Sequence, residues 1–167
     1  MVCLRGQQPR EVCRPDGGGT NIIKGDEDFK QKTQEALDTI KSKPKGNELV
    51  SKLEDSDKKH VITGTDDHNK IRPDADYEYG EGSGSTIYFD PDKKEGGMNE
   101  EGSRERPPFI GLAHELGHAE AIDEGTQSFD RGSKKSGTTP PSEKNSMERE
   151  NQIREEHGLP LRPSYYE

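Results

Sequence analysis

The sequence is short of apolar residues. Hydrophobic side chains make up 24% of its 167 residues, tryptophan is absent, and charged side chains make up 35%. A chain of this composition cannot bury a large core, and it has no stretch that would span a membrane. We predict one compact domain over residues 22–167. Residues 1–21 contain two prolines and three consecutive glycines, which predicts a flexible N-terminal segment.

Cysteine is also scarce. Cys3 and Cys13 are the only two, and a pair ten residues apart in a flexible segment is no disulfide framework, so their role stays open. The N-terminal residues lack the apolar segment of a secretory signal. We therefore expect that, if the protein is exported, the route does not use a cleaved signal peptide.

Basic residues are outnumbered by acidic ones. There are 25 lysines and arginines against 34 aspartates and glutamates, which gives a formal net charge of −9. Phosphate binding needs a clustered positive surface, so the balance argues against a nucleic-acid partner. The simplest interpretation of the acidic excess is solubility, and the alternative is that it steers basic substrates.

Secondary-structure patterns are clear in part of the chain. Apolar residues at helical spacing predict a helix over 26–41, and Pro44–Gly46 would end it before a shorter helix capped by Asn47. Residues 60–63 and 85–89 read as strands, with a polar loop over 64–76. The second strand is a candidate for the central strand of a sheet and also for a strand that pairs with an extended peptide substrate, and the two roles are compatible.

The most apolar stretch, residues 109–120, contains the pattern His-Glu-x-x-His and predicts a helix ending near Asp123. On a helix, His114 and His118 project from one face and can bind one zinc ion. Glu115 then lies beside the metal and can take a proton from water, whose pKa zinc lowers from about 15.7 to about 7. The alternative is a surface helix with solvated side chains. Gly117 is a poor helix former, so we expect it to allow a close approach by another backbone.

A catalytic zinc site needs a third protein ligand. Asp123 and Glu124 follow too closely on the same helix to turn back over the metal. Glu143 and Glu150 are seven residues apart on a second predicted helix, from Glu143 to about Glu156 with Ser142 as its N-cap, so they share one face. The residues alone leave both glutamates as candidates.

Three segments carry a family resemblance: Tyr88–Pro91, Leu112–Ala119 and Glu150–Tyr165. Together they resemble the NleD-like zinc metallopeptidases, bacterial effectors injected into host cells, with related domains at the C-termini of polymorphic toxins. The resemblance covers about residues 22–165. It implies an α+β, zincin-like (gluzincin) single domain with an active-site helix, a small sheet and a C-terminal ligand-bearing helix. It also implies virulence-related secretion and action in a target-cell cytoplasm, on a protein substrate such as a host signalling protein.

A more distant likeness is to clostridial neurotoxin light chains. Glu143 followed by Ser146 is similar to the third zinc ligand of those enzymes, although Ser142 replaces the glutamate usually found before it. Arg162 and Tyr165 resemble their Arg-x-x-Tyr pair, which stabilises the tetrahedral intermediate. The likeness implies Glu143 as third ligand, with Glu150 as the alternative.

These observations predict a monomeric zinc-dependent endopeptidase. Zn²⁺ would be held by His114, His118 and Glu143, Glu115 would be the base, and Arg162 or Tyr165 would hold the oxyanion. The alternative is a non-catalytic, zinc-stabilised protein-binding domain. The presence of Glu115 argues against it, since a purely structural site has no use for a base.

Overall fold

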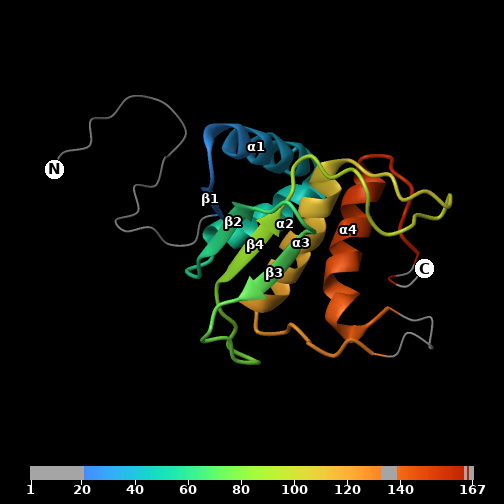
Figure 1. Cartoon of the computed structure of the whole chain (residues 1–167). Coiled ribbons are helices and arrows are strands. Elements are labelled where there is room, and N and C mark those ends of the chain that lie inside the picture. Colours follow the sequence, from blue (N-terminus) through green and yellow to red (C-terminus); the bar gives the residue numbers. More distant parts are fainter. Residues whose placement is uncertain (1–20, 133–138, 164, 166–167) are drawn as a thin grey trace.

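A computed structural model describes residues 21–132, 139–163 and 165 (Figure 1). The predicted flexible segment therefore lies outside the described residues except for Asn21, as do Cys3 and Cys13. The fold is α+β, as predicted. Its elements in chain order are β1 (Asn21–Lys24), α1 (Glu27–Lys41), α2 (Pro44–Asp55), β2 (His60–Gly64), β3 (Lys70–Pro73), β4 (Ser85–Phe89), α3 (Pro108–Asp123), a 3₁₀ turn η2 (Pro141–Glu143) and α4 (Lys144–Glu156). Among these residues, every helix is too short or too polar to cross a bilayer.

Four strands form one small mixed sheet in the order β1-β2-β4-β3. β1, β2 and β4 are parallel, and β3 is antiparallel to β4. The strand predicted over residues 85–89 is therefore internal and paired on both sides. The prediction that it adds a peptide substrate is wrong, because its backbone groups already bond to β2 and β3.

One edge strand is β3, which lies inside the stretch predicted to be a loop, and the other is β1. Of the four residues of β3, Ile71 packs against the core. β3 is too short and too polar to give an alternating pattern in the sequence. It pairs with β4 in the register that places Ile71 opposite Ile87. Within the described residues, the other side of β3 carries no strand.

The helix α3 lies at the centre of the molecule, against the sheet and beside α4 (Figure 1). All of its residues from Ile110 to Ile122 are buried. The surrounding core is formed by apolar side chains from the helices and the sheet, among them Ile40, Leu49, Leu53, Ile62, Ile87, Phe89, Leu116 and Ile153. A chain with few apolar residues thus places them around the helix that carries the His-Glu-x-x-His motif.

Two helix boundaries differ from the prediction. Pro44 begins α2 instead of separating two helices, because proline suits the first helical position, where no N–H is needed. Ser142 lies in η2 and makes no cap, so α4 begins at Lys144. The first helix is confirmed: its N-cap Asp26 accepts a hydrogen bond from the Phe29 N–H at 2.9 Å.

Candidate active site

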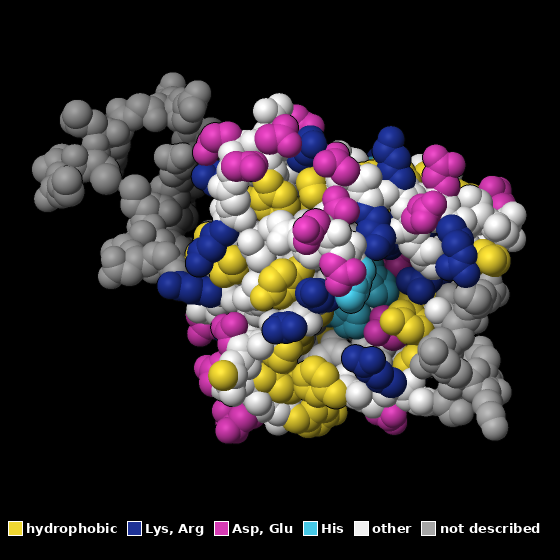
Figure 2. Space-filling view, in the orientation of Figure 1, with side chains coloured by type: hydrophobic (Ala, Val, Ile, Leu, Met, Phe, Trp, Pro, Cys, Tyr) yellow, Lys and Arg dark blue, Asp and Glu magenta, His cyan; other side chains and the backbone are white. Residues whose placement is uncertain are grey.

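The three motif residues face one cavity. His114, Glu115 and His118 are largely buried on α3, and they line a cavity of about 550 Å³ together with residues of β3, of the segment after α3 and of η2. Figure 2 shows histidine side chains in a hollow on this face, with Lys, Arg and apolar side chains around it. The most apolar helix therefore presents its polar residues to an open space.

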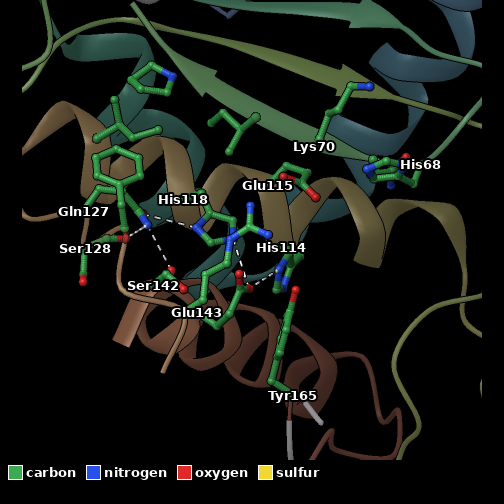
Figure 3. Close-up of a pocket in the computed structure, with 16 residues that line it drawn as sticks. His68, Lys70, His114, Glu115, His118, Gln127, Ser128, Ser142, Glu143 and Tyr165 are labelled. Atoms are coloured by element: carbon green, nitrogen blue, oxygen red, sulfur yellow. Dashed lines mark hydrogen bonds and ion pairs between the residues drawn. The ribbon is translucent and has the colours of Figure 1, made fainter. Parts of the chain in front are cut away.

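Glu143 meets both histidines at one point. Its Oε2 atom lies 3.2 Å from His114 Nε2 and 3.2 Å from His118 Nε2 (Figure 3). The ligand atoms of these three residues lie within 4.8 Å of one another. Two imidazoles and one carboxylate in this arrangement are a donor set that fits zinc.

The remaining nitrogen of each imidazole contacts an acceptor. His114 Nδ1 is 2.8 Å from Glu150 Oε2, and His118 Nδ1 is 3.2 Å from Gln127 Oε1. With a carboxylate and an amide oxygen as partners, each Nδ1 is the donor, so the neutral imidazole that binds a metal has its Nε2 lone pair at the shared point. Metal-binding histidines are typically held in this way. Glu150 thus lies behind His114, whereas Glu143 lies at the shared point.

Electrostatics favour a cation in the cluster. Burial lowers the pKa of His114, but hydrogen bonds to Glu143 and Glu150 outweigh it and raise that pKa to about 9. Burial raises the pKa of Glu143, yet its hydrogen bonds to the two imidazoles bring it well below its usual range. The two glutamates therefore stabilise positive charge where a divalent metal would bind.

Glu115 has a different environment. Burial raises its pKa, and the neighbouring imidazoles of His114 and His118 act in the opposite direction. Its carboxylate lines the cavity beside the cluster. A carboxylate in this position can exchange a proton with a water molecule in the cavity.

Close packing of α4 on α3 positions Glu143. A Cβ atom on Gly117 would lie 2.7 Å from Ser146 Cα, and the Asn145 side-chain amide donates to the Gly117 carbonyl at 2.7 Å. The prediction that Gly117 allows another backbone to approach is confirmed. Any larger residue there would move α4, and Glu143 with it, away from the histidines.

A buried ionic network supports Glu150. Its carboxylate is fully buried and accepts hydrogen bonds from Arg154 Nε at 2.9 Å and from an Arg162 terminal nitrogen at 3.3 Å. The Asn151 side chain bonds to the backbone of Arg162. Arg162 therefore contacts Glu150, so the structure does not bring it to the cluster. Arg154 belongs to the C-terminal segment that carries the family resemblance, but it was given no role from the sequence, although its i,i+4 spacing from Glu150 was a usable signal.

Tyr165 lines the cavity, and in Figure 3 its side chain points toward His114 and Glu143. The Arg162 guanidinium lies 5.1 Å from the centre of the Tyr165 ring. Of the two C-terminal residues singled out from the sequence, only Tyr165 faces the open space. Gln127, which contacts His118, had no signal in the sequence, because its position depends on the path of the chain after α3.

A buried helix that brings two imidazoles and a carboxylate to one point, beside a second carboxylate and an open cavity, defines a candidate metal-dependent hydrolase. The chain belongs to the peptidase M91 family, whose family model, described as effector protein, matches residues 18–149. At family level the protein is a metallopeptidase effector, and the resemblance to NleD-like enzymes is confirmed. Neither the curated proteins nor the solved structures include a match to the chain.

The matched range contains His114, Glu115, His118 and Glu143. It ends just before Glu150, so Arg162 and Tyr165 also lie outside it. The roles of Glu150, Arg162 and Tyr165 are therefore inferred from their contacts in the structure.

Proposed function

We propose that the protein is a zinc-dependent endopeptidase with a zincin-like fold, secreted as a bacterial effector and acting on a protein in the cytoplasm of a target cell. The observation that carries the proposal is the convergence of His114 Nε2, His118 Nε2 and Glu143 Oε2 beside Glu115. Membership of a peptidase effector family supports it.

Zinc would be held by His114, His118 and Glu143. Three protein ligands leave a fourth position open toward the cavity, which is the arrangement of catalytic rather than structural zinc sites. When bound, the metal supplies Lewis acidity, which lowers the pKa of water to about 7 and polarises the scissile carbonyl. Glu150 and Gln127 keep the two imidazoles in the required tautomer and orientation.

Glu115 is the general base in this proposal. It takes a proton from the attacking water and passes it to the leaving amine. Tyr165 donates its hydroxyl hydrogen to the developing oxyanion. Arg162 supports this arrangement indirectly, since it contacts both Glu150 and the Tyr165 ring.

The substrate binds in extended form along β3. Lys70, Ile71 and Pro73 of this strand line the cavity, and the side of β3 that faces away from β4 is the one available for strand addition. Antiparallel addition is the more common geometry in sheets. A peptide bound in this way passes in front of the histidine cluster.

The alternative, a non-catalytic zinc-stabilised binding domain, predicts a metal closed off by four protein ligands. In the described part of the chain, the cluster contains three ligand groups, and a cavity reaches them. Glu115 beside the cluster would have no purpose in such a domain. These features favour the catalytic proposal.

The substitution Glu115→Gln tests the enzyme proposal, because an amide of similar size cannot accept the proton. Wild type and variant, each loaded with zinc, are incubated with a denatured protein mixture, and new N-termini are counted by mass spectrometry. We expect equal zinc content and a rate that falls about 10²- to 10⁴-fold in the variant. Equal cleavage rates would show that the base is misassigned, and zinc-loaded wild type without any cleavage would support the binding-domain alternative.

A further inference from the structure

One aromatic side chain at the cavity is unexpectedly exposed. In the described part of the chain, the exposed large hydrophobic residues are Tyr79, at 78%, and Phe129, at 59%. Phe129 lines the same cavity as His114 and Glu115. A chain with so little apolar material gains nothing for folding by leaving a phenylalanine in water, and exposed apolar side chains at a cavity are typical of ligand contacts.

One ring contact and the hydrogen bonds of neighbouring residues hold Phe129 in place. Its ring packs edge-on against Tyr77 at 5.5 Å, and the Tyr77 hydroxyl donates to the Gln127 carbonyl at 3.0 Å. The Gln127 side chain bonds to His118 Nδ1 at 3.2 Å and donates to the Ser142 carbonyl at 3.0 Å. The segment that carries Phe129 is thus tied to a residue of the proposed metal site. Its ring is pre-organised for binding, which lowers the entropic cost of contacting a ligand.

Three apolar residues line the cavity near the C-terminal end of α3, next to polar residues of the segment that follows it. Ile122 lies one helical turn after His118, and it lines the cavity together with Phe129 and Pro73. The Ser83 N–H donates to the Ile122 carbonyl, which places the C-terminal end of α3 beside the start of β4, where Ser85 pairs with Pro73.

The opposite end of the cavity is polar. His68, Asn69 and Lys70 line it at the start of β3. A Cβ atom on Gly111, near the N-terminal end of α3, would lie 2.6 Å from the Asn69 side-chain amide. On β3 the cavity is therefore lined by the charged Lys70 at one end and by Pro73 at the other, with Ile71 between them.

We propose that Phe129, Ile122 and Pro73 form an apolar subsite for a large apolar side chain of the substrate, on the N-terminal side of the scissile bond. The direction of the bound peptide determines on which side of the scissile bond the subsite lies. A peptide antiparallel to β3 has its N-terminal part at the Pro73 end and its C-terminal part at the Lys70 end. This inference rests on the proposed function, since it assigns specificity to the same site.

Peptides test the subsite. Two series of short fluorescein-labelled peptides are built on a sequence that the wild type cleaves. In the apolar series the residue just before the scissile bond is leucine or phenylalanine, and in the polar series it is serine or aspartate. We expect wild type to prefer the apolar series by about 10- to 200-fold in kcat/KM, the usual range for a hydrophobic pocket. Phe129→Ser should remove most of this preference, and Phe129→Leu should keep most of it. Tyr79→Ser, which removes the other exposed aromatic, is the matched control and should leave the preference unchanged.

A binding measurement separates this inference from the proposed function. Zinc-loaded Glu115→Gln protein, with and without Phe129→Ser, is titrated with two fluorescein-labelled peptide libraries and followed by fluorescence anisotropy. The libraries share random flanking residues and carry either leucine and phenylalanine (the apolar series) or serine and aspartate at one central position, so they do not depend on a known cleavage site. We expect tighter binding of the apolar series and loss of that difference with Phe129→Ser. If this difference in binding is found but wild type cleaves no peptide, the subsite is supported and the proposed peptidase activity is rejected.

Three outcomes would overturn the subsite. One is cleavage or binding without an apolar preference. Another is a preference that Phe129→Ser and Tyr79→Ser change equally. The third is an apolar preference confined to the C-terminal side of the scissile bond, which would contradict the assigned direction.

Discussion

Two carboxylates, the half-buried Glu143 and the buried Glu150, contact the imidazole of His114 through its two different nitrogens. Glu143 reaches Nε2 at the shared point with His118, and Glu150 reaches Nδ1 from behind. A ligand binds the metal itself, whereas a carboxylate behind the ring fixes the orientation of the ring. Removal of each glutamate should therefore have a different consequence.

Glu143→Ala should abolish tight zinc binding and leave the metal-free fold nearly intact, because Glu143 borders the cavity. Glu150→Gln should weaken zinc binding by about 10- to 100-fold. It should also destabilise the metal-free protein by about 3–5 kcal/mol, since Arg154 and Arg162 lose a buried charged partner. Zinc titration and chemical unfolding of each metal-free variant give the two quantities. A greater loss of zinc affinity with Glu150→Gln would make Glu150 the ligand.

Tyr165→Phe isolates the hydroxyl group while keeping the ring against Arg162. We expect unchanged zinc content and melting temperature, with turnover reduced by about 10²- to 10³-fold, because an oxyanion donor acts on the transition state. Tyr79→Phe, on an exposed tyrosine away from the cavity, is the control. Wild-type turnover in Tyr165→Phe would mean that the C-terminal segment only packs against the site.

At the scale of elements, sequence patterns identified those with strong local signals. The helix α1 has a capping aspartate and regular apolar spacing, and β2 and β4 have β-branched runs. β3 could not be predicted, because an edge strand of four residues depends on pairing with β4 for its stability. In the same way, the pattern indicated the motif helix, whereas the choice between Glu143 and Glu150 depends on how α4 packs against it.

Gly117→Ala tests how α4 packing positions the site. The added methyl group would lie 2.7 Å from Ser146 Cα, so α4 must shift. We expect a loss of about 1–3 kcal/mol in the free energy of unfolding, the usual cost of overpacking, together with weaker zinc binding because Glu143 moves. Gly64→Ala, whose new methyl group meets Phe29 at 3.5 Å, an ordinary contact, is the matched control. If Gly117→Ala binds zinc as tightly as wild type, the packing of α4 on α3 does not determine where Glu143 lies.

At the scale of the molecule, ionic contacts supplement a small apolar core. Glu120 on α3 is buried and accepts hydrogen bonds from Arg149 of α4 at 2.7 Å and from Lys52 of α2 at 2.9 Å. Burial raises the pKa of Glu120, but these contacts outweigh it and lower that pKa to about 2. Three helices are thus joined through one carboxylate. Composition indicated a small core, but it did not indicate these partners, since they come from helices far apart in the chain.

Metal removal should destabilise the whole molecule. Zinc at a thousandfold excess over its Kd stabilises the folded state by about 4 kcal/mol, which for a chain of this size corresponds to roughly 10 °C in melting temperature. Calorimetry of the protein before and after chelation measures this shift. Phe129→Ser, outside the proposed ligand set, should show the same shift as wild type. An unchanged melting temperature would argue against a metal bound to the folded state.

The most direct test of the central claim is the initial rate of peptide cleavage as zinc is titrated into chelated protein. We predict no cleavage without metal, a rise in rate that levels off at about one zinc per chain, and no such rise for zinc-loaded Glu115→Gln. Full activity in protein shown by metal analysis to be free of zinc would contradict the claim. Saturation with zinc that raises the melting temperature but produces no cleavage would also contradict it.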